Sequence, residues 1–536
     1  MHEVARRVAL RPVSLARTPC AADSRHMADA TPDPFVCALR EQLGAASGGP
    51  VALHETHLSW VLLAGDGAWK LKRPVRLPFV DFSTPALRHA ACLEELRLNR
   101  RLAPGLYLDV VPIHGDRAAP RWQGGGPVID HAVHMRRFAD DALLGARVAA
   151  GTLSRAQVDR LAARLAAFHR DAERCGAAGL VPPERTAADL AAQVLAADDP
   201  RTRALRRWLL DEAARLAPRF REREAGGAVR DGHGDLHLDN LVVVGDDVTA
   251  FDALEFDPGL RRIDIVADLA FATMDLGARG RPDLAARLLD GWLAGTGDFE
   301  GLRVMRFHEV CRALVRALVR RLSPAGGPAA APDYLEVARG LARTADTPRL
   351  LLMHGLSGSG KSRLASALLE RAGAVRVRSD VERKRLAGLA ADASSRAAGL
   401  ALYDAASTRR TYAALLDAAR AALDGGRPVI VDATCLRRDQ RDPFRDEARA
   451  RAVPFAVLAC EAPHALLRER VARRALEGRD ASEADLAVLD AQCRDAEAFD
   501  ADELADVWRI DTSGDVDVDV EAIARRWAAA SRDAVA

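Results

Sequence analysis

The segment 355–362, Gly-Leu-Ser-Gly-Ser-Gly-Lys-Ser, constrains the fold of this 536-residue chain more than any other. It fills each fixed position of the pattern G-x-x-x-x-G-K-S/T, which places a phosphate-binding loop between a buried strand and a helix. The flanks agree, because 349–354 is largely apolar and 363–371 has the spacing of an amphipathic helix. Glycines let successive backbone N–H groups point at one phosphate in front of a helix N-terminus. The segment therefore predicts a site for a nucleoside triphosphate, which we take to be ATP.

The side chains at the end of this loop have separate predicted roles. Lys361 would reach the β- and γ-phosphates, so we count it as catalytic as well as nucleotide-binding, and the Ser362 hydroxyl would ligate Mg²⁺. The nucleotide-binding residues predicted in the loop are Gly355, Ser357, Gly358, Ser359, Gly360, Lys361 and Ser362.

Strand and helix patterns alternate from this loop to the end of the chain. Such alternation predicts a doubly wound parallel sheet whose ligand lies at the carboxyl ends of the strands. Asp432 ends a buried strand, where a carboxylate can hold Mg²⁺ through water. Ala433 follows it, whereas motor ATPases usually carry a water-activating Glu there, so the sequence favours phosphoryl transfer to a hydroxyl. The strands predicted after the loop are 374–378, 428–431, 455–459 and 507–510.

Asp380 and a group of arginines complete the predicted site of this domain. Asp380 follows a strand, where it could hold an acceptor hydroxyl, but Ser379–Glu382 is also a capping box. Both interpretations stay open, and Asp380 is kept as a catalytic candidate. Arginines of a lid would neutralise charge on the transferring phosphoryl group, and Arg473 is the one we choose for nucleotide binding. The arginines of this segment are Arg470, Arg473, Arg474 and Arg479.

A second informative segment is 233–240, His-Gly-Asp-Leu-His-Leu-Asp-Asn, which a strand–turn–strand pattern follows. Asp235 can orient and deprotonate an attacking hydroxyl. Asn240, and Asp252 at the end of the second strand, can hold the Mg²⁺ ions that bridge ATP phosphates. An acid in a loop, an amide five residues on and an acid after a hairpin therefore predict a second site for phosphoryl transfer.

These residues resemble the catalytic core of the aminoglycoside phosphotransferase-like kinases, distant relatives of the protein kinases. The resemblance covers about 50–325, and Asp264–Ala270 matches the segment that follows the metal-binding Asp in that superfamily. It implies that Lys70, or else Lys72, holds the nucleotide phosphates.

The same resemblance implies further contacts with the nucleotide. Glu95, or else Glu94, would be the partner of the phosphate lysine, and 133–136 would be the hinge that contacts adenine through Met135. The chain departs from the protein kinases in lacking a G-x-G-x-x-G loop over the phosphates. It also has Ala253-Leu-Glu255 where D-F-G would continue. Glu255 and Asp257 could contribute to the metal site, but we expect them to be surface carboxylates.

The C-terminal part resembles the gluconate-kinase and zeta-toxin branch of P-loop kinases. The whole arrangement is similar to bifunctional aminoglycoside phosphotransferase/ATP-binding fusion proteins. The resemblance implies an α+β protein-kinase-like bilobal domain, followed by an α/β P-loop domain with a doubly wound parallel sheet. The predicted division is 1–26, a disordered leader or misassigned start; 27–322, the kinase-like domain; 323–347, a linker with a short helix; and 348–536, the P-loop domain.

Composition limits the partners and the compartment. The formal net charge is +1, from 77 basic and 76 acidic residues, so no global field favours nucleic acid or a membrane. The eight cysteines include no C-x-x-C pair, which suits a reducing cytoplasm, and no apolar run approaches the length of a membrane span. We therefore expect a cytoplasmic protein that binds neither nucleic acid nor membrane; the sequence predicts no oligomeric state.

The combined prediction is an ATP- and Mg²⁺-dependent phosphotransferase with two nucleotide-binding domains. Its acceptor would be a small hydroxylated molecule. The alternative is a regulatory protein that senses nucleotide and transfers little phosphate. The predicted helix 302–322 carries six arginines against one acid, Glu309, so we expect an anionic or neutral acceptor rather than a polycationic aminoglycoside.

Overall fold

The computed structural model describes residues 33–77, 80–176, 180–195, 200–322, 332–343, 348–391, 393, 404–477, 484–514 and 520–533. The predicted leader, the linker residues 323–331 and 344–347, and Arg479 lie outside the described residues. The chain divides into two compact units, one formed by 1–139 with 251–258 and the other by 140–250 with 259–536. The predicted domain boundaries stay predictions.

The first unit is built on an antiparallel sheet in the order β1-β2-β3-β8-β6-β7. Helix α1 buries Phe35, Val36 and Leu39 against Leu62 and Ile113 of this sheet, so the alternating apolar residues of the strands form one core. The elements of this unit are α1 (Pro34–Ser47), β1 (Ala52–Glu55), β2 (Ser59–Ala64), β3 (Gly67–Lys72), β4 (Arg76–Leu77), β5 (Val80–Asp81), α2 (Pro85–Asn99), β6 (Tyr107–Gly115), β7 (Pro120–Arg121) and β8 (Val128–Arg136).

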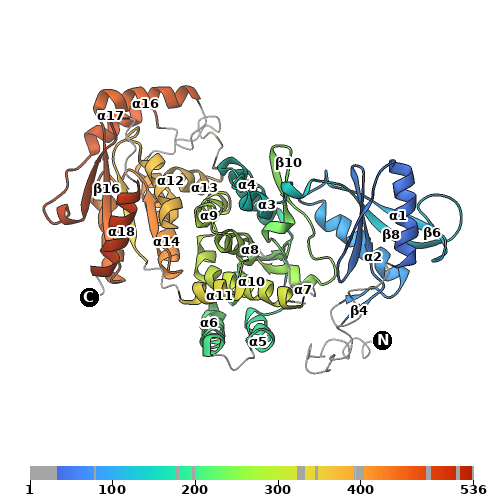
Figure 1. The fold of residues 1–536 in the computed structure, drawn as a ribbon. Helices are drawn as coiled ribbons and strands as arrows, with labels where there is room; N and C mark the ends of the chain where they lie inside the picture. Colours follow the sequence, from blue (N-terminus) through green and yellow to red (C-terminus); the bar gives the residue numbers. More distant parts are fainter. Residues whose placement is uncertain are drawn as a thin grey trace. The chain divides into compact units, whose positions relative to one another are not determined.

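The second unit begins with helices and short strand pairs, drawn in green in Figure 1. Helix α8 is apolar on nearly every face and is buried from Ile265 to Leu276, so other helices pack around it. The elements up to 322 are η1 (Asp140–Ala142), α3 (Leu144–Ala149), α4 (Arg155–Asp171), α5 (Pro183–Gln193), α6 (Pro200–Ala225), β9 (Val229–Asp231), η2 (Leu238–Asn240), β10 (Leu241–Val244), β11 (Asp247–Ala250), α7 (Pro258–Arg261), β12 (Arg262–Asp264), α8 (Ile265–Ala278), α9 (Pro282–Thr296), η3 (Phe299–Gly301) and α10 (Leu302–Leu322).

The remainder of this unit contains a parallel sheet in the order β14-β15-β13-β16-β17. The predicted doubly wound parallel sheet is therefore confirmed, with β13 at its centre. Its elements, yellow through gold and orange to red in Figure 1, are α11 (Tyr334–Arg343), β13 (Leu350–His354), α12 (Lys361–Ala372), β14 (Val375–Arg378), α13 (Ser379–Leu386), α14 (Ala405–Asp424), β15 (Val429–Asp432), α15 (Arg438–Ala450), β16 (Phe455–Glu461), α16 (His464–Glu477), α17 (Leu486–Asp495), η4 (Leu504–Asp506), β17 (Val507–Asp511) and α18 (Val520–Asp533).

The inner strands β13, β15 and β16 are buried on both faces over nearly their whole length, which explains their nearly continuous apolar runs. Leu350, Leu351, Leu352 and Met353 of β13 are each fully buried. The loop that follows β13 therefore starts from a rigid strand at the carboxyl edge of the sheet. Within the described part of the chain, no helix has both the length and the apolar character needed to cross a bilayer.

Candidate functional site

The loop between β13 and α12 has a backbone that favours glycine at three positions. Gly355, Gly358 and Gly360 have φ of 135°, 84° and 82°, which other residues rarely adopt. A Cβ atom at Gly355 would lie 2.5 Å from the Cys460 carbonyl oxygen, and one at Gly358 would lie 2.8 Å from that of Leu467. The glycines of the motif are therefore required by the path of the chain as well as by the predicted phosphate.

Lys361 begins α12 and folds back over its own loop. Its Nζ donates to the Leu356 carbonyl oxygen at 2.8 Å and lies 3.4 Å from Ser359 Oγ. Burial lowers the pKa of Lys361, although the nearby Asp432 opposes this. The ammonium group is thus held beside the loop's backbone, where the motif predicts phosphate oxygens.

Asp432 and Ser362 form the predicted metal site behind this loop. Ser362 Oγ donates to Asp432 Oδ1 at 3.1 Å. Asp432 is 5% exposed, and its Oδ2 has no hydrogen-bond partner among the residues that the structure describes. Burial raises the pKa of this carboxyl group, despite Arg376 and Arg378 nearby. A hydroxyl and a buried carboxylate oxygen left without a donor suit Mg²⁺, which takes oxygen ligands and water.

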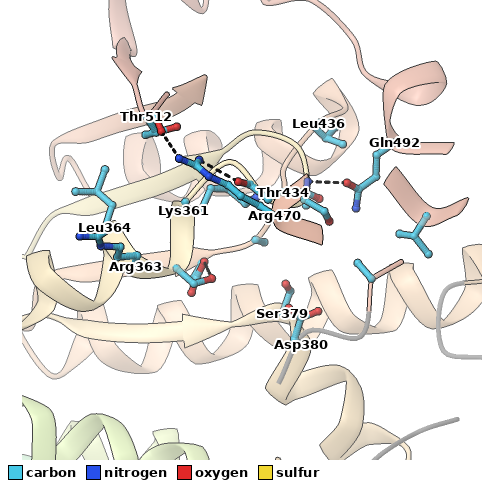
Figure 2. A pocket seen from close by; sticks show the side chains of 18 of the residues that line it. Lys361, Arg363, Leu364, Ser379, Asp380, Thr434, Leu436, Arg470, Gln492 and Thr512 are labelled. Atoms are coloured by element: carbon cyan, nitrogen blue, oxygen red, sulfur yellow. Dashed lines mark hydrogen bonds between the residues drawn. The ribbon is translucent and has the colours of Figure 1, made fainter. Parts of the chain in front are cut away.

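A cavity of about 720 Å³ opens in front of the loop. Asp380, Arg470, Arg473 and Arg474 line it together with Lys361. That these residues form an acceptor site under an arginine-bearing lid stays a prediction. Figure 2 shows Ser379 and Asp380 across from Lys361 and Arg470.

The capping box predicted at Ser379 is not formed. Helix α13 begins at Ser379, its N-cap is Arg378, and no side chain caps it, because β14 runs directly into the helix. The carboxylate of Asp380 therefore does not cap the helix, and its interpretation as an acceptor contact is the one that stays a prediction.

Sequence reasoning missed several residues that hold the loop. Gln492 of α17 accepts a hydrogen bond from the Ser357 N–H at 2.9 Å, as drawn in Figure 2. Thr512 Oγ1 donates to the Ser359 carbonyl oxygen at 2.8 Å, and Arg470 Nη2 donates to the Thr512 carbonyl oxygen at 2.9 Å. Gln492 and Thr512 belong to no motif and lie more than 100 positions from the loop, so no sequence signal identified them. Arg470 was predicted as an arginine of the lid, but not as a residue that holds the loop.

The first unit brings the predicted phosphate lysine and its partner together. Lys70 Nζ lies 2.9 Å from Glu95 Oε1 and 2.5 Å from Asp252 Oδ1. Glu95 is fully buried, and although burial raises its pKa, Lys70 and Lys72 lower it to about 2. Glu94 instead pairs with Arg97 on the exposed side of α2, so Glu95 is the residue in the cluster.

Both strand lysines belong to this cluster. Lys72 is 1% exposed and pairs with Glu95 Oε2 at 2.5 Å and with Glu255. The expectation that Glu255 is a surface carboxylate is wrong, since its side chain is 6% exposed. Met135 lies on β8, the strand next to β3, where it pairs with Ala68. It is half-buried and lies two residues after Val133, which pairs with Lys70.

Asp252 has an unusual backbone, with φ of 63°. Its N–H donates to the Tyr107 hydroxyl at 3.1 Å, and the next N–H, of Ala253, donates to Asn99 Oδ1 at 2.9 Å. These contacts and the bond to Lys70 fix a carboxylate in a strained conformation, which is common at functional sites.

In the second unit, Asp235 and Asn240 meet within one loop. Asn240 Nδ2 donates to Asp235 Oδ2 and to the Asp235 carbonyl oxygen, both at 3.0 Å. Burial raises the pKa of Asp235, but the nearby His237 outweighs this and the pKa is lowered. Asp235 is therefore an ionised carboxylate that can accept a hydrogen bond from a hydroxyl.

A buried acid supports the backbone of this loop. Asp268 accepts hydrogen bonds from the N–H groups of His233 and Gly234 at 2.8 and 2.9 Å. His169 Nε2 lies 3.2 Å from the same carboxylate, and Trp292 Nε1 donates to His169 Nδ1 at 2.9 Å. His169 is thus a packed structural residue.

Two of the six arginines of α10 act on the Asp235 loop. Arg316 lies 3.3 Å from Asp239 Oδ2, and its charge helps to lower the pKa of Asp235. Arg312 donates to the Ala267 carbonyl oxygen, stacks on Phe271 and interacts electrostatically with Asp235. Arg303, Arg306, Arg320 and Arg321 contact Asp424, the Gly426 carbonyl, the Pro332 carbonyl and the Gln193 carbonyl respectively.

Comparison with solved structures returns kinases for each part of the chain. A choline/ethanolamine kinase family protein from Mesorhizobium loti is 14% identical, with 57% of this chain and 92% of that chain covered and a TM-score of 0.34. A gluconokinase from Sinorhizobium meliloti 1021 is 21% identical, with 35% and 95% covered and a TM-score of 0.25.

Comparison of sequences identifies the family. Residues 350–499 match the AAA domain model AAA_33. "Uncharacterized protein Rv2004c" of Mycobacterium tuberculosis and "Uncharacterized protein Mb2027c" of Mycobacterium bovis are each 32% identical over 483 residues, which covers 87% of this chain and 93% of theirs. The chain therefore belongs to the family of these mycobacterial proteins.

Proposed function

We propose that this protein is an ATP-dependent phosphotransferase that carries two nucleotide sites and phosphorylates hydroxyl groups of small molecules. The observation that carries the proposal is the arrangement at the P-loop. The loop, Lys361 and the Ser362–Asp432 pair border one cavity with Asp380 and the arginines of α16. Phosphate, metal and acceptor contacts are thus grouped as phosphoryl transfer requires.

At the P-loop site, the chain's own residues would bind and orient the reactants. Backbone N–H groups and Lys361 would hold the phosphates, while Ser362 and Asp432 would hold Mg²⁺. When bound, Mg²⁺ neutralises charge on the phosphate oxygens. Asp380 would accept a hydrogen bond from the acceptor hydroxyl, and Arg473 would contact the transferring group.

The kinase-like part would use a second set of residues. Lys70, positioned by Glu95, holds the nucleotide phosphates, and Met135 lies at the hinge that contacts adenine. Asp252 and Asn240 would hold metal in their respective units. Asp235, ionised and tethered by Asn240, would orient the acceptor hydroxyl and take its proton.

The charge around Asp235 supports an anionic or neutral acceptor for this part. Arg312 and Arg316 offset the carboxylates of Asp235 and Asp239. A site for a polycation needs a surplus of carboxylates around its ligand, and these two arginines remove that surplus.

The test is to incubate the protein with a small-molecule cell extract, Mg²⁺ and ATP labelled at the γ-phosphate. Labelled products are then identified by mass spectrometry. We expect one or more labelled hydroxyl compounds, with kanamycin, added as a polycation, unlabelled. Lys361→Ala and Asp235→Ala should remove products of their own sites. If calorimetry counts two ATP sites but no molecule is labelled, the nucleotide-sensing alternative replaces this proposal.

A further inference from the structure

Within the second unit, helices of the segment 140–322, among them α4, α9 and α10, share a buried interface with the P-loop domain. We call these helices the kinase-like helices. Ala286 of α9 is part of the apolar cluster formed by Leu364, Leu368 and other residues of the P-loop domain. Two arginines, Arg155 of α4 and Arg287 of α9, each lie 2.7 Å from the carboxylate of Glu370 on α12. Helix α12 begins at the phosphate-binding loop, so the kinase-like helices contact the element that positions Lys361 (Figure 1).

Helix α9 is itself fixed in position on its other side. Added Cβ atoms at Gly291 and Gly295 would lie 2.7 and 2.6 Å from the Cβ atoms of Ala162 and Ala166 on α4. Such close approach leaves α9 little freedom to rotate or shift. A side chain that α9 presents to the P-loop domain therefore has a defined position.

Asp290 is such a side chain, and it binds Arg376 of β14. Arg376 Nε lies 3.2 Å from Asp290 Oδ1, and its Nη2 lies 2.7 Å from Asp290 Oδ2. The remaining nitrogen, Nη1, donates to Ser366 Oγ at 2.5 Å and lies 3.4 Å from the Ser362 carbonyl oxygen. The Arg376 side chain is 8% exposed, so its charge is compensated by these contacts rather than by water.

The same guanidinium lies beside the metal carboxylate. Arg376 Nη1 is 3.8 Å from Asp432 Oδ2, which is close enough for charge attraction and too far for a hydrogen bond. That oxygen is the one without a hydrogen-bond partner among the described residues. Because a buried carboxylate oxygen without a donor is unfavourable, Arg376 would pair with Asp432 if Asp290 did not hold it.

We propose that Asp290 is a positioning residue of the P-loop site: it holds Arg376 away from Asp432 and so keeps that carboxylate available for Mg²⁺. The inference rests on the proposed nucleotide site at the P-loop. It means that the kinase-like part supplies a residue on which metal binding by the other domain depends.

The test measures how nucleotide binding by the full chain depends on Mg²⁺, using calorimetry with ATP. Lys361→Ala identifies which component of the binding belongs to the P-loop. In Asp290→Asn, the Mg²⁺ concentration for half-maximal binding of that component should rise about 10-fold to 100-fold, the usual effect of losing a group that supports a metal ligand. ATP binding in EDTA should change little, because it reports on the loop and not on Asp432.

A second substitution separates positioning from simple damage to the interface. Asp290→Asn combined with Arg376→Met removes the competing guanidinium, so the Mg²⁺ dependence should return toward that of wild type. A merely structural role predicts that the double variant is as impaired as the single variant or worse, and that result would overturn the proposal. If Asp290→Asn does not fold, Asp290→Glu replaces it; this variant keeps the carboxylate and should keep the wild-type Mg²⁺ dependence.

Glu309→Gln is the matched control. Glu309 of α10 lies 2.9 Å from Arg427, in another partly buried ion pair of the same interface. Arg427 lies before the amino end of β15, whereas Asp432 lies at the carboxyl end of that strand. Glu309→Gln should leave the Mg²⁺ dependence of ATP binding at the P-loop unchanged. If Asp290→Asn also leaves it unchanged, the inference fails while the nucleotide site stands. If Lys361→Ala removes no binding component, the proposed site fails as well.

Discussion

At the scale of single residues, the sites are distinguished by charged groups that burial alone would make unfavourable. Glu95 and Lys72 are nearly inaccessible to solvent, yet each is ionised because opposite charges lie within hydrogen-bond distance. Asp432 is the opposite case, since burial raises its pKa and its Oδ2 has no donor among the described residues. Opposite charges within the protein therefore compensate Glu95 and Lys72, whereas we expect a bound ligand to compensate Asp432.

Replacing Glu95 by Gln should strongly destabilise the first unit. The change leaves Lys70 and Lys72 with one carboxylate fewer, and breaking a buried pair costs about 3–5 kcal/mol of unfolding free energy. Glu94→Gln is the control, because it removes an exposed pair with Arg97 that contributes roughly 0.3–0.5 kcal/mol. Urea unfolding followed by circular dichroism measures both. Equal losses in the two variants would contradict the assignment of Glu95 to the cluster.

The pH dependence of this contribution has a defined sign. The pKa of Glu95 is lowered to about 2, so its stabilising contribution is present above the ordinary Glu pKa of about 4.3. It is lost as the pH falls from there toward 2. The difference in unfolding free energy between wild type and Glu95→Gln should therefore shrink over this interval.

Asp432→Asn should stabilise the protein while weakening its use of metal. An acid whose pKa is raised by folding is stabilising below its ordinary pKa, and this contribution is lost as the pH rises through the raised value. At neutral pH the ionised group is therefore unfavourable. The substitution should therefore raise the unfolding free energy of the ligand-free protein at neutral pH.

Metal titrations of the same variant provide the second half of this test. Binding of ATP at the P-loop should lose most of its dependence on Mg²⁺. A less stable Asp432→Asn protein, or one with unchanged Mg²⁺ dependence, would show that Asp432 is an ordinary structural carboxylate.

At the scale of elements, the sequence predicted best those segments whose apolar pattern is simple, either a continuous run in a buried strand or one apolar face of a helix. The strands of the parallel sheet and the helices α10 and α12 were predicted within a few residues of their bounds. Helix α8 was not predicted, because burial on nearly every side removes the periodicity that identifies a helix. The capping box at Ser379 failed for a different reason, since its pattern is local and β14 continues into α13 without a cap.

The two ends of α12 allow a matched pair of glycine substitutions. Gly358 in the preceding loop and Gly373 at the C-cap both have positive φ, so Ala is strained at each by about 1–3 kcal/mol. Only at Gly358 would the added Cβ also meet backbone, 2.8 Å from the Leu467 carbonyl oxygen, whereas that at Gly373 has no atom within 4 Å.

Gly358→Ala should therefore displace the loop and weaken ATP binding at the P-loop by at least about tenfold, which corresponds to 1.4 kcal/mol. Gly373→Ala should lower the melting temperature and leave ATP affinity unchanged. Calorimetry and thermal unfolding of both variants make the comparison. Unchanged affinity in Gly358→Ala would show that this loop backbone does not hold the nucleotide.

At the scale of the whole molecule, residues that form contiguous motifs could be predicted, and their long-range partners could not. Asp235 with Asn240, and the loop with Lys361, are close in sequence, so their grouping follows from local geometry. Asp290 and Arg376 are 86 positions apart, and each is an ordinary charged residue in its own segment. Such pairs depend on how helices pack, which a single sequence does not specify.

The last prediction is that the two proposed sites bind nucleotide separately. Lys361 contacts Leu356 and Ser359 of its own loop, and Asp235 contacts Asn240 and His237 of its own. Lys361→Ala should therefore remove one ATP site and spare the other. Asp235→Ala should keep both ATP sites, since Asp235 is proposed to contact the acceptor, and should abolish transfer by the kinase-like part.

Calorimetry that counts ATP sites in each variant, together with product analysis, decides between separate and shared sites. Asp290→Asn should be measured in the same experiment, because Asp290 lies on α9 and its substitution is expected to affect the P-loop site alone. That pattern would mean that the kinase-like part affects the P-loop site through the interface between them, and not through a shared nucleotide pocket. Loss of both ATP sites from Lys361→Ala would instead require a single composite site, and the scheme of two separate nucleotide sites would be wrong.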